Sequence, residues 1–551
     1  MNFQFTSKIK RNLFILIAAG LVMFIVGFMG EKNHMYSEIA VAEDGTESIL
    51  VEYYKELPAS LMDGKFEENV KAAAAEQGIS VDFKNLVGHH AGHQESDHHD
   101  EFEFKMLLTP HALETAATHA KEVGHEHDGH EGEVHGNDTH GEGSHSAHDD
   151  DSHSAHHDDS HGSHGGVAHS PIETLGHIVH EQGAFADAGH ARSWSNLLVN
   201  AFFFFGIGLG ALFFIALQYA TESGWGVVYK RILEAIIGWL PIGAIFLVIV
   251  FFAGTMHWNH IWHWMDPAVT DPASSHFDPI IANKKPFLSQ WFFWLMNAIY
   301  FAVFLLFARG FRKRSLQEDI EGGTKIHMRN FAKGALFLVL FGYLSSVMSW
   351  HWIMSIDTHW FSTLFGWFVF SGIWVSATIF ILLLTFWLKS QGYVKFINES
   401  HIHDMGKWMF AISFLWTYLF FSQFMLIWYA DIPEEVTYYL DRFGNYKWIL
   451  WTTVAVNFVI PIVLLMSREA KRSKITILII GSILFVFHWV DVFILVMPGS
   501  VFDHWAIGFL EIGMFISFLG IFIFVVLNTL SKAPLLVKNH PYLDENLHQD
   551  T

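Results

Sequence analysis

The chain has 551 residues, of which 51% are hydrophobic and 16% aromatic, and its mean hydropathy is positive. This composition is far from that of an average soluble domain and indicates a polytopic membrane protein. The formal net charge of −22 resides in residues 31–192 and in short polar loops, so we expect no nucleic-acid partner. Cysteine is absent, which excludes disulfides, cysteine-ligated iron–sulfur clusters and covalently attached c-type haem within this chain.

Ten apolar segments are long enough to span a hydrocarbon core of about 30 Å. Lipid offers the backbone no hydrogen-bond partner, so each segment should be a helix and the protein all-α. The segments lie near residues 13–30, 195–219, 231–254, 287–309, 330–350, 364–388, 406–429, 448–467, 474–497 and 508–530. We expect two four-helix up-down bundles, made by helices 2–5 and 6–9, with helices 1 and 10 at their flanks.

These segments divide the chain into six parts. They are an N-terminal transmembrane helix (1–30), a long loop (31–192), a first bundle (193–350), a second bundle (351–497), a last transmembrane helix (498–531) and a tail (532–551). Lysine and arginine are concentrated in alternate connections, and the positive-inside rule places these connections, both termini and the tail in the cytoplasm. The long loop then faces outward. Four basic residues on the outward side are exceptions: Lys284, Lys285, Arg442 and Lys447.

The first segment has a second interpretation. The basic stretch "KIKR" precedes it, and Ala40-Val41-Ala42 resembles the small-residue cleavage site of a signal peptide. The apolar run is longer than the roughly 7 to 15 residues usual in signal peptides, and the candidate cleavage site lies well beyond it. These features favour a retained helix, and the downstream topology is the same in both cases.

The long loop changes composition along its length. Its first part, to about residue 122, is interpreted as helical from "FEENVKAAAAEQ" and "HALETAATHAKEV". Residues 123–170 are then dominated by His, Asp, Gly and Ser. Such a tract suits divalent transition metals, but too little of it is apolar for folding, which favours a disordered linker with weak metal affinity. Its candidate ligands include His153, His156, His157, His161 and His164.

Aromatic and ionisable residues gather where segments reach the predicted outer side. The stretch 349–363, "SWHWIMSIDTHWFST", contains His351, Asp357 and His359, and the stretch 428–435, "WYADIPEE", contains Asp431 and Glu434. Tryptophan commonly anchors helices at the membrane interface, and we assign that role to the indoles. The repetition of such clusters suggests that the two bundles are similar halves.

Two ionisable residues lie well inside the ninth segment. His488 and Asp491 are three residues apart, so they share one helix face. Ionisable groups at that depth are costly and mark a proton path, an ion path or a ligand contact, unless they form a satisfied buried pair. Glu511, near the outer end of the last segment, either takes part in such a path or reaches out to the interface.

Residues 351–363, "HWIMSIDTHWFST", followed by Gly366-Trp367 and Ser371-Gly372, resemble the signature of a known membrane-protein family. It is the F-type integral subunit of alternative complex III, a bacterial quinol:cytochrome c oxidoreductase whose membrane subunits are similar to NrfD-like polysulfide-reductase anchors. "WYADIPE" at 428–434 and the ten-helix pattern agree with this resemblance, which covers roughly residues 195–530. The His-rich tract lies outside it.

The resemblance implies a multi-pass subunit in the bacterial inner membrane that supports menaquinol oxidation at the periplasmic side. Haem c and iron–sulfur clusters belong to partner subunits, and this chain holds no covalently bound cofactor. The implied partners are a C-type NrfD-like sister that carries the quinol site, the iron–sulfur and c-haem subunits, a terminal cytochrome oxidase, and the bilayer. The chain itself is then not a catalyst on its own.

Eight residues are candidates for a proton path or a quinol rim, because imidazoles and carboxylates accept the protons that quinol oxidation releases. They are His351, Asp357, His359, Asp431, Glu434, His488, Asp491 and Glu511. Two other functions stay open at this point. One is a divalent-metal transporter with the His-rich loop as collector, and the other is a purely structural membrane anchor.

Overall fold

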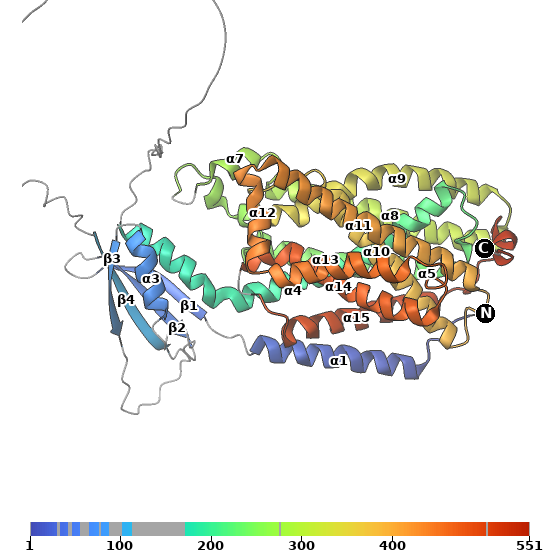
Figure 1. Ribbon diagram of the computed structural model, residues 1–551, viewed down its shortest axis with the longest axis horizontal. Coiled ribbons are helices and arrows are strands. Elements are labelled where there is room, and N and C mark those ends of the chain that lie inside the picture. Colours follow the sequence, from blue (N-terminus) through green and yellow to red (C-terminus); the bar gives the residue numbers. More distant parts are fainter. Residues whose placement is uncertain are drawn as a thin grey trace, which may run out of the picture. The chain divides into compact units, whose positions relative to one another are not determined.

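The computed structural model divides the chain into two units, one within Asn33–Asp187 and one formed by Met1–Lys32 and Ala188–Thr551 (Figure 1). It describes residues 2–29, 34–41, 47–54, 65–76, 79–86, 102–112, 171–274, 277–502 and 505–549. Nearly all of the predicted "HALETAATHAKEV" helix and the whole tract 123–170, with its histidines His153, His156, His157, His161 and His164, lie outside these residues.

Ten spans within the described residues are long and apolar enough to cross a membrane, which confirms an all-α polytopic membrane protein. The third span contains two α-helices separated at Gly238 and Trp239, and each of the others contains one α-helix. Their bounds are α1 (Ser7–Met29), α4 (Pro171–Ala220), α5 (Lys230–Ile237) with α6 (Leu240–Thr255), α8 (Gln290–Glu321), α9 (Lys325–Trp352), α10 (Phe365–Ser390), α11 (Glu399–Ala430), α13 (Lys447–Leu465), α14 (Lys474–Val501) and α15 (Phe509–Leu530).

Short helices connect or extend these spans. α7 and α12 lie at one end of the helical unit and α16 at the other (Figure 1); we call these ends the α12 end and the α16 end. The short helices are η1 (Val227–Tyr229), η2 (His263–Met265), η3 (Pro267–Thr270), α7 (Pro279–Lys284), η4 (Met354–Ile356), α12 (Pro433–Gly444) and α16 (Leu543–Leu547).

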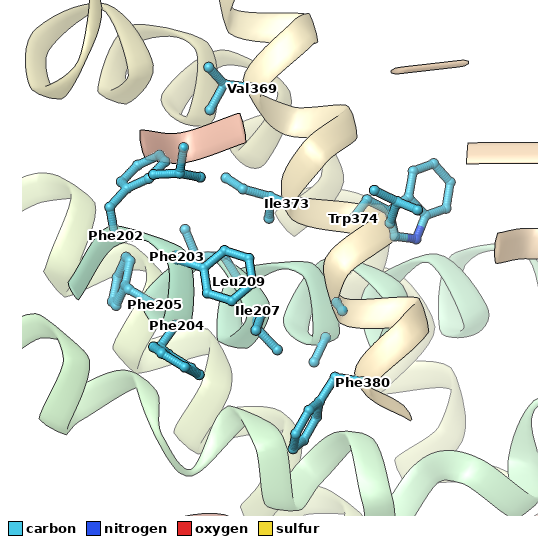
Figure 2. Close-up of a cluster of buried hydrophobic side chains, with 14 of the residues drawn as sticks. Phe202, Phe203, Phe204, Phe205, Ile207, Leu209, Val369, Ile373, Trp374 and Phe380 are labelled. Atoms are coloured by element: carbon cyan, nitrogen blue, oxygen red, sulfur yellow. The ribbon is translucent and has the colours of Figure 1, made fainter. Parts of the chain in front are cut away.

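The core of the helical unit lies between α4 and α10. Phe202, Phe203, Phe204 and Phe205 are all buried, and Figure 2 shows them with other apolar side chains of α4 beside Val369, Ile373 and Trp374 of α10. Small residues allow the two backbones to approach closely, because a Cβ added at Gly210 would lie 2.7 Å from Cβ of Ala377. Within the span Ala191–Ala220, α4 is therefore almost entirely buried among other helices.

The second predicted bundle is present as a ring of four helices. α10 packs on α11 and α14, and α13 packs on α11 and α14. In the first half, α8 packs on α9, α5 and α6, while α4 meets α9 at Gly334, where an added Cβ would lie 2.8 Å from the carbonyl oxygen of Ala216. Because α9 and α4 both contact α10, the two halves share one core.

The flanking helices α1 and α15 pack against each other along a line of small residues. A Cβ added at Gly27 would lie 2.4 Å from the backbone nitrogen of Leu510, and one added at Gly513 would lie 2.4 Å from that of Phe24. Such close approach maximises van der Waals contact between helices where lipid supplies no hydrophobic driving force. The glycines at these crossing points therefore define how α1 docks.

The smaller unit corrects the prediction that the first part of the loop is helical. It contains an antiparallel sheet in the order β1-β2-β4-β3 together with α3 (Lys65–Glu76), which confirms the helix expected at "FEENVKAAAAEQ". The strand stretches include short runs such as "SILVEYY" and "FKMLL", in which apolar residues suit a sheet packed on one helix. The strands are β1 (His34–Val41), β2 (Glu47–Tyr54), β3 (Ile79–Leu86) and β4 (Phe102–Ala112).

The tryptophans range from exposed to buried, so the assignment of the indoles as interface anchors was only partly right. Exposed ones, which fit anchoring, are Trp258, Trp291, Trp367, Trp428, Trp448 and Trp451. Buried ones are Trp239, Trp262, Trp264, Trp352, Trp360, Trp374, Trp416 and Trp489. Buried indole N–H groups need a partner, and Trp352 donates to Oδ1 of Asn297 over 2.8 Å.

The C-terminal segment after α15 is packed on the helical unit. Its Asn546 is buried, accepts a hydrogen bond from the backbone N–H of Val228 (2.8 Å) and donates one to the carbonyl oxygen of Trp225 (2.6 Å). The ring of His401, on α11, donates to the carbonyl oxygen of Asn546 over 2.9 Å. The segment thereby joins parts of both halves at the α16 end.

Candidate functional site

The deepest ionisable group lies on α14, where His488 and Asp491 share a face as their spacing predicts. Both side chains are buried. Nε1 of Trp416, on α11, donates to Oδ2 of Asp491 over 3.0 Å, and neither ring nitrogen of His488 has a hydrogen-bond partner. A buried polar group without a partner is costly, which makes this pair a candidate site.

A small cavity adjoins this pair. It has a volume of about 10 Å³ and is lined by His488, Asp491, Gly372, Ser376 and apolar residues of α4 and α10. That volume is about what one water needs, and a quinol ring does not fit. Gly372 keeps the space open, because an added Cβ would lie 3.4 Å from Oδ2 of Asp491. The site therefore suits water and protons.

A second cluster forms at the α12 end around Asp357. Nη2 of Arg442 lies 2.9 Å from Oδ2 of Asp357, and the guanidinium lies 3.5 Å from the ring centroid of Tyr438. The ring of Trp360 stacks on the ring of Tyr438, and the two ring centroids are 3.8 Å apart. The sequence motif at 351–363 is thus held to α12 by one ion pair and one aromatic stack.

Tyr438 is in electrostatic range of two carboxylates. Burial raises the pKa of its hydroxyl above the usual value, Arg442 acts to lower it, and the negative charges of both Asp357 and Asp491 raise it. The phenol therefore stays protonated at ordinary pH, and it lies within electrostatic reach of Asp491 in α14 and of Asp357 at the end of the bundle.

His359 forms a separate, more exposed pair. Its Nε2 donates to Oδ2 of Asp278 over 2.5 Å, and the carbonyl oxygen of His359 accepts from Nζ of Lys284 over 3.1 Å. Asp278 also caps α7, since its Oδ1 accepts from the backbone N–H groups of Ile280 and Ile281. Burial acts to raise the pKa of Asp278, but these hydrogen bonds outweigh it and hold that pKa below its ordinary value.

His351 has a complete set of contacts within the first half. Its Nε2 donates to the carbonyl oxygen of Phe287 (3.4 Å), so Nδ1 accepts from the hydroxyl of Tyr300 (2.9 Å). The ring also stacks on Phe287 at a centroid distance of 4.1 Å. This histidine orients the end of α9 and is not part of the cluster around Asp357.

The remaining candidates are dispersed. Asp431 ends α11 with a left-handed backbone (φ 49°) and is exposed, as is Glu434 in the first turn of α12. Glu511 is fully buried, which excludes the interpretation that it reaches out to the interface. Its Oε1 pairs with Arg192 (2.7 Å) and its Oε2 caps α15 through the N–H of Gly508 (2.8 Å).

Several residues of these clusters were missed by the sequence analysis. Trp416 and Tyr438 carry no signal that distinguishes them from other aromatic residues. Arg442 and Lys284 do carry one, because both are exceptions to the predicted distribution of basic residues. Both contact the motif at 351–363, Arg442 through Asp357 and Lys284 through the carbonyl oxygen of Thr358 (2.6 Å).

The fold and these clusters define a polytopic α-helical membrane protein with ionisable groups buried in its second bundle. No model of a known protein family matches the chain, and no curated protein matches it. The functional argument therefore rests on the residues themselves.

Proposed function

We propose that this protein is an integral membrane subunit of a respiratory quinol:cytochrome c oxidoreductase and conducts protons that accompany quinol oxidation. The observation that carries the proposal is the buried Asp491 of α14 beside a water-sized cavity, with Tyr438 of α12 in electrostatic range of both Asp491 and Asp357. The resemblance of residues 351–363 to the F-type subunit of alternative complex III supports it, because Asp357 belongs to that motif.

The path begins at His488 and Asp491 beside the one-water cavity. Carboxylates and imidazoles exchange protons with water, and within a membrane they mark proton routes. From Asp491 the proton passes by way of Tyr438 to Asp357, which pairs with the Arg442 guanidinium at the rim. Because protons leave there, the α12 end faces the periplasm of a bacterial inner membrane, and the termini face the cytoplasm.

The quinol site and the redox centres belong to partner subunits in this proposal. The 10 Å³ cavity beside His488 excludes a quinol ring, which supports a proton-handling role for this chain. The partners are a C-type sister with the menaquinol site, an iron–sulfur subunit and c-haem subunits, with a terminal oxidase as the next acceptor. The exposed residues Asp431 and Glu434 lie at the α12 end, where such subunits bind.

Purification of the native assembly tests the first part of the proposal. The protein is isolated in mild detergent through a tag on this chain, and the sample is analysed by mass spectrometry and by a haem-stained gel. Co-purifying c-haem and iron–sulfur subunits with quinol:cytochrome c activity are expected. A lone chain without haem partners or activity would overturn the respiratory assignment.

Variants of the path test the second part. In complexes reconstituted into liposomes, Asp491→Asn and Asp357→Asn should each lower proton release per electron, and His488→Ala should slow turnover. Gly372→Ala is a finer probe, because its added Cβ is tolerated sterically but fills the cavity. Asp266→Asn is the matched control, since Asp266 only caps η3. Full turnover and unchanged proton release in all four variants would refute the path.

The two other functions make different predictions in these experiments. A purely structural anchor would show altered assembly in the variants but unchanged turnover of the complexes that form. For a metal transporter, His488 and Asp491 should belong to a set of metal ligands. Among the described residues, however, the group with metal-ligand spacing is at the α16 end and includes neither of them.

A further inference from the structure

Three buried residues from different parts of the chain meet at the α16 end. Glu318 lies on α8, His327 on α9 and His540 in the segment after α15, and one donor atom from each lies within 4.8 Å of the others. Nδ1 of His327 is 3.7 Å from Oε1 of Glu318. Ligands of tetrahedral zinc are separated by about 3.4 Å, given bonds of about 2.0–2.1 Å. The His327–Glu318 pair is near this separation, and binding would draw the other atoms together from within 4.8 Å.

The hydrogen bonding of these residues is incomplete. Both ring nitrogens of His327 and Oε1 of Glu318 are buried without a partner, although such atoms are normally satisfied in proteins. Nδ1 of His540 accepts only a 3.3 Å hydrogen bond from the backbone N–H of Tyr542, which metal binding would replace. The unused donor atoms thus point to a ligand that accepts their lone pairs.

A cavity adjoins the two imidazoles. It has a volume of about 20 Å³ and is lined by His327, His540, Tyr219, Lys230 and neighbouring side chains. This space holds one water, and a zinc ion with three protein ligands commonly takes a water as its fourth.

The charges around the group are balanced. Lys230, Arg231 and Arg312 pair with Glu318, Glu234 and Asp319. Lys230 binds Oε2 of Glu318 over 2.8 Å and leaves Oε1 free. Such a contact orients a ligating carboxylate, but the nearby ammonium charge also weakens the attraction for a cation.

We propose that Glu318, His327 and His540 bind a divalent transition-metal ion of the zinc type. Two imidazoles and one carboxylate match the preferences of Zn²⁺. The ion would join α8, α9 and the C-terminal segment. The site shares no residue with the proton path or with the His-rich tract.

Cobalt binding to the full-length protein tests this proposal. The protein is purified through a tag without histidine, stripped with a chelator and titrated with Co²⁺ in a buffer whose competing chelator keeps weak sites, including the tract 123–170, empty. We expect one Co²⁺ per chain with visible absorption bands of a tetrahedral ion, displaced by Zn²⁺. Zn²⁺ should also raise the melting temperature.

Variants distinguish this site from any other. His327→Ala and His540→Ala should weaken binding by at least about 100-fold and abolish the bands, whereas His548→Ala, on the same segment, should leave them unchanged. Lys230→Met should strengthen binding by roughly tenfold, because it removes an opposing charge.

Equal Co²⁺ affinity in His327→Ala and the wild type would overturn the proposal, as would the absence of tetrahedral bands at saturating Co²⁺. If the histidine variants fail to fold, the Co²⁺ affinity of Lys230→Met tests the proposal. If Glu318, His327 and His540 serve only in packing, this variant should bind Co²⁺ no more tightly than the wild type.

Discussion

Arg442 joins several parts of the α12 end. Its guanidinium is buried, pairs with Asp357, donates to the carbonyl oxygen of Tyr438 (2.9 Å) and covers the ring of the same tyrosine. Removal of one partner from a buried ion pair leaves an uncompensated charge, which costs more than the pair contributes. We therefore expect that replacing Arg442 lowers the stability of the fold even when the new side chain has a similar size.

Arg442→Met should lower the free energy of unfolding by about 3 kcal/mol, because the Asp357 carboxylate loses its partner. Thermal unfolding in detergent, followed by tryptophan fluorescence, measures the change. Lys447→Ala is the control, since Lys447 is an exposed basic residue of the same segment. Addition of Asp357→Asn to Arg442→Met should restore part of the loss; an unchanged melting temperature in Arg442→Met would contradict the argument.

Acidification should loosen α7 through Asp278. Because the pKa of this carboxyl is held below its ordinary value in the folded protein, its stabilising contribution is complete above the ordinary value and is lost as the pH falls through the lowered one. Hydrogen exchange of the α7 amides should therefore accelerate below about pH 4.

In Asp278→Asn the exchange should be faster at neutral pH and lose this acid dependence. Asp271→Asn serves as control, since Asp271 caps the neighbouring turn through the N–H of Ala273. Acid-dependent exchange that persists in Asp278→Asn would place its origin in another group.

Single residues also mark the limit of what the sequence predicts. The pairing of His488 and Asp491 on one face follows from their spacing, and the structure agrees. Their contact with Trp416 and their position near Tyr438 depend on how α11, α12 and α14 pack, and no periodicity specifies that. For the same reason, the sequence does not show that His351 and Asp357 of the motif have different surroundings. In the structure, His351 contacts Tyr300 and Phe287 and lies apart from the cluster around Asp357.

Among the helices, the pair α1 and α15 depends most on glycine. The close backbone approach at Gly27 of α1 and Gly513 of α15 leaves no room for a side chain. α1 can therefore dock on α15 only where neither helix carries a side chain at the crossing point. If α1 were cleaved, this surface of α15 would lose its partner. We therefore expect intact-protein mass spectrometry to find α1 retained.

Gly513→Leu should displace α1, because its side chain would occupy the position of the Phe24 backbone. The measurement is co-purification of a separately expressed fragment, residues 1–32, with the remainder of the chain. Gly342→Leu is the matched control, since nothing lies within 4 Å of a Cβ at Gly342. Equal recovery of the fragment with both variants would contradict glycine-dependent docking.

Helices were more predictable from the sequence than strands. Long apolar runs determine the membrane spans. The observed helices differ from the predicted segments at their ends, where α8 and α11 extend into polar turns. The strands β1 to β4 are short, and their pairing joins residues far apart in the chain. Helix propensity correctly predicted α3 at residues 65–76, but the neighbouring stretches form the strands β2 and β3 instead of helices.

At the α16 end, Asn546 contacts both halves of the helical unit. Its side chain bonds the backbone beside α5, and its carbonyl oxygen binds the ring of His401 on α11. The first and second halves are thus tied together by one residue of the C-terminal segment, in addition to their shared core.

Asn546→Ala should lower the free energy of unfolding by about 2 kcal/mol, because the hydrogen bonds of its side chain to the backbone of Val228 and Trp225 are lost at about 1 kcal/mol each. Thermal unfolding in detergent measures the effect, and protease sensitivity of residues 531–549 should rise. Glu545→Ala, an exposed neighbour on α16, should change neither. Equal stability of the two variants would show that the segment does not hold the halves together.

The buried position of α4 has a consequence for the synthesis of the protein. α4 is made before α10, yet Phe202 to Phe205 and Gly210 pack against α10 and other later helices. During insertion the newly made helix therefore faces lipid on the sides that it later buries, which its apolar surface tolerates. The first half therefore cannot complete its core until the second half has been synthesised. A chain that ended between the two halves would insert into the membrane but remain incompletely packed.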